Sequence, residues 1–343
     1  VGQLILSSFA IGFAEYAEAL IPGIDLAIVA AAIMILCFVA NLFGIKTAAR
    51  FQTVMVLGLL VSLILYIVFG MAHIEDYSPY TAIPTVMPNG FGGFFAAAFL
   101  LRLSLIGSEF ISEFGDEMEN PGKMIPLVMG LSLAIVVVLY IFIAVVATGV
   151  LPLEEIAGKN LAATAKIIFS PTVYVAFIGG GIMISLVTSL NAIFGWCTRG
   201  LYRATEDGWL PPKLAAVNRH GVPYIYLTVF FLIGITPILT GMTLDYVAIL
   251  GNAVGAIFGL FPVFALFNLA KRNPEAYRNA PFRLPLWATK SFPILAVIIY
   301  GYGIYSSWGF IGNTGWLLLL GYSTVVLIYI QLRTPYVAQL KEH

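Results

Sequence analysis

The feature that most constrains this chain is an apolar run of helix length that is interrupted in its middle. Residues 94–126 read FFAAAFLLRLSLIGSEFISEFGDEMENPGKMIP. The apolar stretch is interrupted by Ile106-Gly107-Ser108 and continues with carboxylates at Glu109 and Glu113. Backbone groups freed by an interruption inside a bilayer have no water to bond, so such breaks are tolerated where they line a cavity. In secondary transporters that cavity holds the substrate, so the run predicts a transporter with its working centre near Gly107.

Composition agrees with a membrane protein, because 60% of the residues are hydrophobic and 10% are charged, against about 25% charged in soluble domains. The apolar runs are about 20 residues long, the length of a helix that crosses a bilayer. We therefore expect an all-α polytopic protein that forms a single transmembrane transporter domain over residues 1–343. Ten spans are expected, at residues 1–20, 26–43, 51–71, 94–114, 124–151, 172–200, 223–240, 244–270, 292–308 and 316–332.

Lysine and arginine gather in alternate connections, which the positive-inside rule assigns to the cytoplasm. The basic positions are Lys46, Arg50, Arg199, Arg203, Lys213, Arg219, Lys271, Arg272, Arg278, Arg283, Lys290, Arg333 and Lys341. The first span is then expected to run outward, and the C-terminus to be cytoplasmic. We expect an integral protein of the plasma membrane. Residues 203–222 are expected to form either a short interfacial helix, with Trp209 and Leu210 on one side, or a solvated connector.

Three segments carry a resemblance to a known family. They are Ser104-Leu105-Ile106-Gly107-Ser108-Glu109 followed by Glu117-Met118-Glu119-Asn120-Pro121, Arg199-Gly200-Leu201-Tyr202-Arg203-Ala204 followed by Glu206-Asp207-Gly208-Trp209-Leu210-Pro211, and Asn41-Leu42-Phe43-Gly44-Ile45-Lys46. In this order they resemble the broken sixth helix and two cytoplasmic loops of the amino acid–polyamine–organocation (APC) superfamily of secondary transporters.

The resemblance implies the inverted-repeat (5+5) APC/LeuT-type transporter fold. It implies transport of amino acids or related amines by alternating access, with ion coupling or exchange. The chain begins inside a span without a methionine, so we expect it to resemble family helices 3–12. The family's broken first helix, which contributes half of the substrate site, would then be absent. No catalytic Ser/His/Asp set is visible, so an enzyme is not expected.

By resemblance the substrate-binding residues lie around the break. They are Leu103, Ser104, Ile106, Gly107, Ser108 and Glu109. Gly107 and Ser108 would form the unwound point, and Glu109 would bond freed N–H groups, bind a cation, take a proton or act as a structural tether. The family's outer-gate aromatic residue is missing here, and Leu103 and Leu105 stand near its position. The resemblance therefore does not indicate which side chain the substrate carries.

Arg102 is a cation inside an apolar run, and a buried arginine needs a partner. Glu15 and Glu18 are candidates by depth. The guanidinium can instead contact the substrate or extend outward to the interface.

A possible ion site involves Ser185, Thr188 and Ser189. Thr188-Ser189 resembles the hydroxyl pair that completes a sodium site in sodium-coupled members of the wider fold. The same residues can simply pack helices and donate hydrogen bonds to the i−4 carbonyls. The position near Gly58, where some proton-coupled relatives carry a lysine, is uncharged, which argues against a lysine–proton mechanism. The coupling ion is thus Na⁺ or H⁺, or there is exchange without one, and no cofactor is expected.

Two alternatives stay open. Gly115-Asp116, Asn120-Pro121 and Ile125-Pro126 resemble cation–chloride carriers, which favours an inorganic ion cotransporter of the same fold. A non-transporting receptor or partner subunit is the other alternative. The expected partners are a small amino acid or amine and the lipid bilayer, with no nucleic acid, in a monomer or homodimer.

Overall fold

The chain folds into helices in a computed structural model that describes residues 2–44, 49–77, 80 and 87–341. No strand occurs among these residues. Lys46 of the third sequence motif lies outside them, as do the side chains of Arg50, Glu113 and Glu117. The chain divides into two compact units, one formed by residues 80–138 and 248–320, the other by residues 2–79, 139–247 and 321–343. We call them the break unit and the packed unit.

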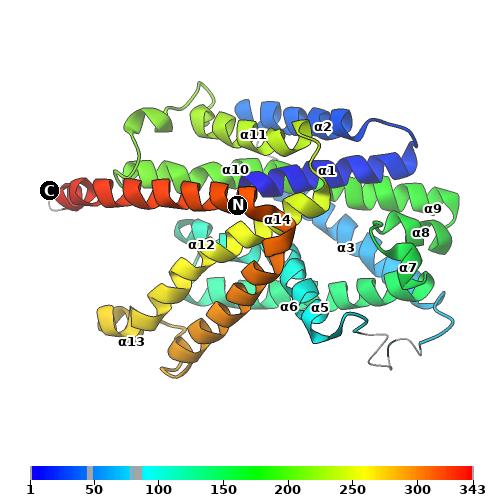
Figure 1. Ribbon diagram of the computed structural model, residues 1–343. Helices are drawn as coiled ribbons and strands as arrows, with labels where there is room; N and C mark the ends of the chain where they lie inside the picture. Colours follow the sequence, from blue (N-terminus) through cyan, green and yellow to red (C-terminus); the bar gives the residue numbers. More distant parts are fainter. Residues whose placement is uncertain (1, 45–48, 78–79, 81–86, 342–343) are drawn as a thin grey trace. The chain divides into compact units, whose positions relative to one another are not determined.

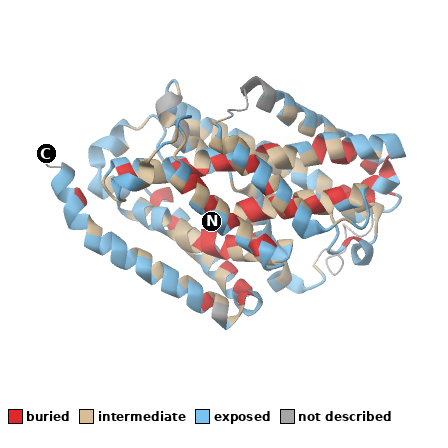
Figure 2. Cartoon of the chain, turned by 90° about the horizontal axis from the view of Figure 1, so that it is seen from above, coloured by how far each residue is buried: buried red, intermediate tan, exposed pale blue. Residues whose placement is uncertain are grey.

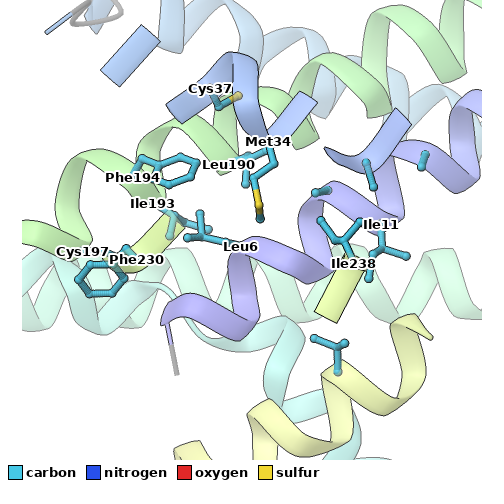
Figure 3. Close-up of a cluster of buried hydrophobic side chains, with 14 of the residues drawn as sticks. Leu6, Ile11, Met34, Cys37, Leu190, Ile193, Phe194, Cys197, Phe230 and Ile238 are labelled. Atoms are coloured by element: carbon cyan, nitrogen blue, oxygen red, sulfur yellow. The ribbon is translucent and has the colours of Figure 1, made fainter. Parts of the chain in front are cut away.

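The packed unit contains a group of helices that lie side by side in Figure 1, α1 (Gly2–Leu20), α2 (Leu26–Leu42), α10 (Ile184–Glu206) and α11 (Tyr224–Leu239). Small side chains on α1 allow the close approach, since Ser7, Ala10 and Ala14 are fully buried. The Ser7 hydroxyl donates to the carbonyl of Gly234 at 2.5 Å. Figure 3 shows the apolar cluster between these helices, with Leu6, Met34, Leu190 and Phe194 among its members.

A second core of the packed unit surrounds Tyr66 of α3 (Ala49–Met71), which is fully buried. Its hydroxyl is 2.6 Å from Thr164 Oγ1, so its polar end is satisfied. Its ring stacks on Phe177 with centroids 5.5 Å apart. Phe177 belongs to a π-helical segment, Ala176–Met183, that continues into α10. The unit also holds α7 (Leu153–Ile156), α8 (Ala162–Ile168), α9 (Pro171–Val175) and a 3₁₀ turn at Pro212–Ala215.

The break unit contains α5 (Gly90–Leu101), which is followed by two 3₁₀ segments, Arg102–Leu105 and Ser108–Glu117. It also holds most of α12 (Leu244–Arg272), α13 (Pro274–Asn279) and the first part of α14 (Ala288–Lys341). Helix α6 (Pro121–Val150) begins in this unit and ends in the other. Asn120 before it has φ 52°, and Pro121 takes the first helical position, where its missing N–H is not needed.

Helix α12 and the first part of α14 lie side by side in Figure 1. Gly259 faces Tyr300, and a Cβ at Gly259 would lie 3.1 Å from the tyrosine ring. The two spans predicted at 292–308 and 316–332 are present as two helical parts of α14, 288–313 and 315–340, which are separated by a kink at Gly312 with φ 72° and ψ 165°.

Seven helices of the described residues are long and apolar enough to cross a membrane. They span 53–71, 90–112, 121–150, 171–206, 244–272, 288–313 and 315–340, with shorter apolar helices at Leu26–Leu42 and Tyr224–Leu239. Only 6–33% of the residues in their most apolar windows are buried. Apolar side chains therefore face outward, as in Figure 2, where the end of α14 near the C-terminus is mostly exposed. A lipid environment suits such surfaces.

Residues 203–222 do not form the expected interfacial helix over their whole length. Helix α10 continues to Glu206, and the motif Asp207-Gly208 ends it, with Gly208 at φ 83°. The loop then contacts α14, because the Tyr329 hydroxyl donates to the Trp209 carbonyl at 2.7 Å and Arg333 Nε donates to the Gly208 carbonyl at 2.9 Å. The charged motif therefore works as a helix stop that is held by hydrogen bonds.

Candidate functional site

The predicted interruption is present at Ile106 and Gly107. Ile106 is extended, with φ −70° and ψ 138°, and Gly107 has φ 140° and ψ −36°. The second pair of angles is open to glycine and strained for other residues. Helical hydrogen bonding therefore stops at these two residues, and helical turns resume at Ser108.

The carboxylate of Glu109 satisfies one backbone group at the interruption. Its Oε2 accepts a hydrogen bond from the Gly107 N–H at 2.8 Å. The Glu109 side chain is exposed, as is Gly107. The expected contact with a freed N–H is thus present, and the carboxylate also stays accessible to a ligand.

The residues after the interruption form an unusually long 3₁₀ segment. It runs over the ten residues Ser108–Glu117, whereas 3₁₀ runs longer than three or four residues are uncommon and often mark a hinge or strain. The sequence predicted that the apolar helix resumes here, without this change of helix type. The Ser112 hydroxyl donates to the Glu109 carbonyl at 2.7 Å, which ties the first turn of the segment.

A polar contact with α12 supports the other side of the interruption, where α5 changes to 3₁₀ geometry. The Asn252 amide donates to the carbonyls of Phe99 and Leu100, the second at 3.4 Å. Asn252 Oδ1 accepts from Arg102 Nη1 at 2.8 Å. Because Asn252 is fully buried, this one side chain satisfies carbonyls at the end of α5 and positions the guanidinium.

Within the break unit, Arg102 has the partners Asn252 and Tyr300, and pairing with Glu15 or Glu18 of the packed unit stays a prediction. Besides Asn252, the guanidinium lies over the ring of Tyr300, 4.8 Å from its centroid. Helix α14 also approaches α5 closely at Gly303, where a Cβ would collide with the buried ring of Phe99. Three elements of the break unit, α5, α12 and α14, therefore meet around Arg102.

Asn252 was not among the residues that the sequence pointed to. It lies in the predicted span 244–270, and an amide inside an apolar span needs hydrogen-bond partners. That requirement was the available signal, but the sequence does not name partners that are 150 residues away.

The residues predicted to bind substrate form one short stretch of the break unit. Leu103, Ser104, Ile106 and Ser108 are exposed or half-buried, so the stretch presents both backbone and side chains. Their role in binding stays a prediction.

The residues predicted to bind an ion lie on α10 of the packed unit. The buried Thr188 hydroxyl donates to the Ser185 carbonyl at 2.9 Å. This bond resembles the back-bonding of the packing alternative, although it goes to the i−3 and not the i−4 carbonyl. The role of Ser185, Thr188 and Ser189 in ion binding stays a prediction. In the described part of the chain no group of three or more His, Cys, Asp or Glu residues is placed to hold a metal ion.

Comparison with known proteins gives a family model, described as amino acid permease, that matches residues 3–329. The branched-chain amino acid permease BcaP of Bacillus subtilis is 28% identical, over 83% of this chain and 58% of the relative. The methylthioribose transporter of the same organism is 26% identical, over 95% of this chain and 72% of the relative. Its serine/threonine exchanger SteT is 28% identical, over 78% and 60%. The chain thus spans roughly three fifths to three quarters of the length of these relatives.

Proposed function

The chain belongs to the amino acid permease family of the APC superfamily, and we propose that it carries amino acids or related amines across the membrane by alternating access. It is an integral multi-pass membrane protein and a transporter rather than an enzyme. We further propose the inverted 5+5 repeat with ten spans, in which α1, α2 and α11 cross the membrane with the seven longer helices. We also propose that the C-terminus lies in the cytoplasm and that the protein resides in the plasma membrane. We propose that it is a monomer or a homodimer.

The observation that carries the proposal is the interruption at Ile106-Gly107 with Glu109 on the freed amide. A backbone that leaves the helix offers N–H and C=O groups to a polar solute, and its hydrogen bond to a carboxylate can be exchanged for one to the ligand. A zwitterionic amino acid or amine matches this mixture of carboxylate and backbone dipoles. The names of two relatives, an amino acid permease and a serine/threonine exchanger, support this class of substrate.

We propose that transport is driven by a coupled ion or by exchange of one substrate for another. Both modes fit the family, and the SteT relative is named as an exchanger. Uptake into proteoliposomes under a sodium gradient, a proton gradient or internal unlabelled substrate separates the three modes. If Thr188 and Ser189 hold sodium, the double change Thr188→Ala, Ser189→Ala abolishes a sodium dependence. If they only pack α10, the ion dependence is unchanged.

The test of the proposal is uptake of a panel of labelled amino acids and amines by the reconstituted protein. Glu109→Ala removes the bond to Gly107 and is expected to lower uptake at least tenfold, in the range of a lost charge-assisted hydrogen bond. Glu109→Gln keeps a hydrogen-bond acceptor without charge. If it retains most uptake, the carboxylate acts as a tether. If it fails like alanine or shifts the pH profile, the charge itself takes part. Unchanged uptake in both variants contradicts the role of Glu109.

A further inference from the structure

The connection from α12 to α14 is strongly basic and joins two apolar helices of one unit. Residues 271–290 hold five Lys and Arg residues and one acidic residue, Glu275. The flanking helices, 244–272 and 288–313, are both long and apolar enough to cross a membrane. The connection between two such helices lies at the membrane surface.

A pocket of about 620 Å³ opens in this connection. Tyr277, Arg278, Arg283, Leu284 and Leu286 contribute to its walls. Its volume is in the range of about 300–1,000 Å³ that ligand sites occupy. Figure 1 shows the short helix α13, which carries Tyr277 and Arg278, between α12 and the start of α14.

Hydrogen bonds inside the segment hold the pocket together. The Tyr277 hydroxyl donates to the Leu284 carbonyl, and Arg283 Nη1 lies 3.5 Å from the Arg278 carbonyl. The two arginines, five positions apart in the sequence, therefore both line the pocket.

The charge of these arginines is not balanced within the described part of the chain, where neither guanidinium forms an ion pair. Arg203 differs, because it pairs with Glu206 at 3.2 Å. Two exposed guanidinium groups at one pocket are suited to a phosphate, which arginine binds with two parallel hydrogen bonds.

Large apolar side chains stand exposed beside the cationic pocket. Phe282 is 59% exposed, Leu286 61% and Trp287 66%. Tryptophan is enriched at the level of lipid headgroups, where its ring meets both water and acyl chains. A ligand that satisfies both surfaces has an anionic phosphate and adjoining hydrocarbon.

We propose that the pocket of Arg278 and Arg283 binds the headgroup of an anionic phospholipid, whose acyl chains lie along Leu286 and Trp287. Basic pockets at the ends of membrane helices bind such headgroups. This site is separate from the interruption at Gly107 and does not depend on the transported substrate.

The test is native mass spectrometry of the purified protein released from nanodiscs that contain phosphatidylglycerol and phosphatidylcholine. The parent protein is expected to retain phosphatidylglycerol in preference to phosphatidylcholine. The double change Arg278→Gln, Arg283→Gln should lower that retention at least tenfold. The matched control Lys271→Gln, Arg272→Gln removes the same charge from exposed positions outside the pocket walls and should keep it.

Each other outcome contradicts the proposal. Equal losses in the two double variants would mean general surface charge, and full retention in the pocket variant would mean that lipid binds elsewhere. Excess inorganic phosphate that displaces the lipid completely would identify a site for small anions. Arg278→Lys, Arg283→Lys checks that the loss is not unfolding, since it should recover part of the retention.

Discussion

Two of the interruptions of long apolar helices in the described residues differ in kind. The first, at Ile106-Gly107, ends helical bonding, and the Glu109 carboxylate accepts a hydrogen bond from the freed Gly107 N–H. The second, at Ala176–Met183, widens the helix into a π-helix that stays hydrogen bonded within itself. It is also packed, because Phe177, Ile178, Gly181 and Ile182 are buried. The first interruption is exposed and the second belongs to a core.

The difference separates a segment that can bind from a segment that can only pack. At the first interruption the Gly107 amide bonds to an exposed carboxylate, and a ligand can take that place. At the second, Gly181 lies against α3, where a Cβ would be 2.6 Å from Ser62 Oγ. π-Helical segments often occur at functional sites, but close packing against α3 accounts for this one. We therefore propose that the substrate binds at the first interruption.

The largest effect is expected for Gly107→Ala. Alanine at φ 140° is strained by about 1–3 kcal/mol, so the interruption should shift towards a helical conformation and lose its open backbone groups. We predict at least a tenfold fall in uptake, measured with labelled substrate in proteoliposomes. The control is Gly180→Ala in the π-helix, where a Cβ meets open space, and it should change stability by less than about 0.5 kcal/mol. Equal uptake by the two variants would remove the distinction between the interruptions.

A smaller effect is expected for the supporting contact of the first interruption. Asn252→Ala leaves two carbonyls and a guanidinium without their partner, at a cost of about 1–3 kcal/mol. Thermal unfolding of the detergent-solubilised protein measures it.

Arg102→Gln tests the same contact from its other end. In a double-mutant cycle the two changes should be non-additive by about 0.5 kcal/mol or more, since they share one hydrogen bond. Additive losses would show that the amide and the guanidinium act independently.

The smallest effect is expected for Gly181→Ala in the π-helix. The methyl group would meet Ser62 Cβ at 2.8 Å, and overpacking of this kind costs about 1–3 kcal/mol. The Ser62 hydroxyl can rotate away but its Cβ cannot, so α3 and the π-helix must shift slightly apart. Ser62→Gly should restore the thermal midpoint, and uptake per folded molecule should stay constant. A loss of uptake without a loss of stability would place function in the π-helix.

The sequence allowed the interruption to be predicted because its cause is local. A glycine with an acidic residue two positions later is costly inside an apolar run, so this pattern favours a helix that breaks at a cavity over one that simply spans the bilayer. The Asp207-Gly208 stop and the start of α6 at Pro121 are local in the same way.

Features that depend on distant contacts could not be predicted. Asn252, the hydrogen-bond partner of Arg102, lies 150 positions further along the chain. The apolar run around Arg102 does not indicate which buried amide will contact the guanidinium. The 3₁₀ form of residues 108–117 was missed because the alternation of apolar and polar residues suits either helix type. The kink of α14 at Gly312 is again local, and the boundary between the predicted spans 292–308 and 316–332 falls there because glycine and asparagine normally mark a loop.

The most direct test of the account is substrate protection at the interruption. A cysteine at Ser108 should react with a thiol reagent, and a transported amino acid should slow that reaction, because the substrate would cover the backbone next to it. A cysteine at Gly180 should react at the same rate with and without substrate. Cys37 and Cys197 are both buried, and the parent protein measures their background labelling. Protection at Ser108 alone is the predicted result, and equal rates at Ser108 with and without a substrate that the protein transports would contradict it.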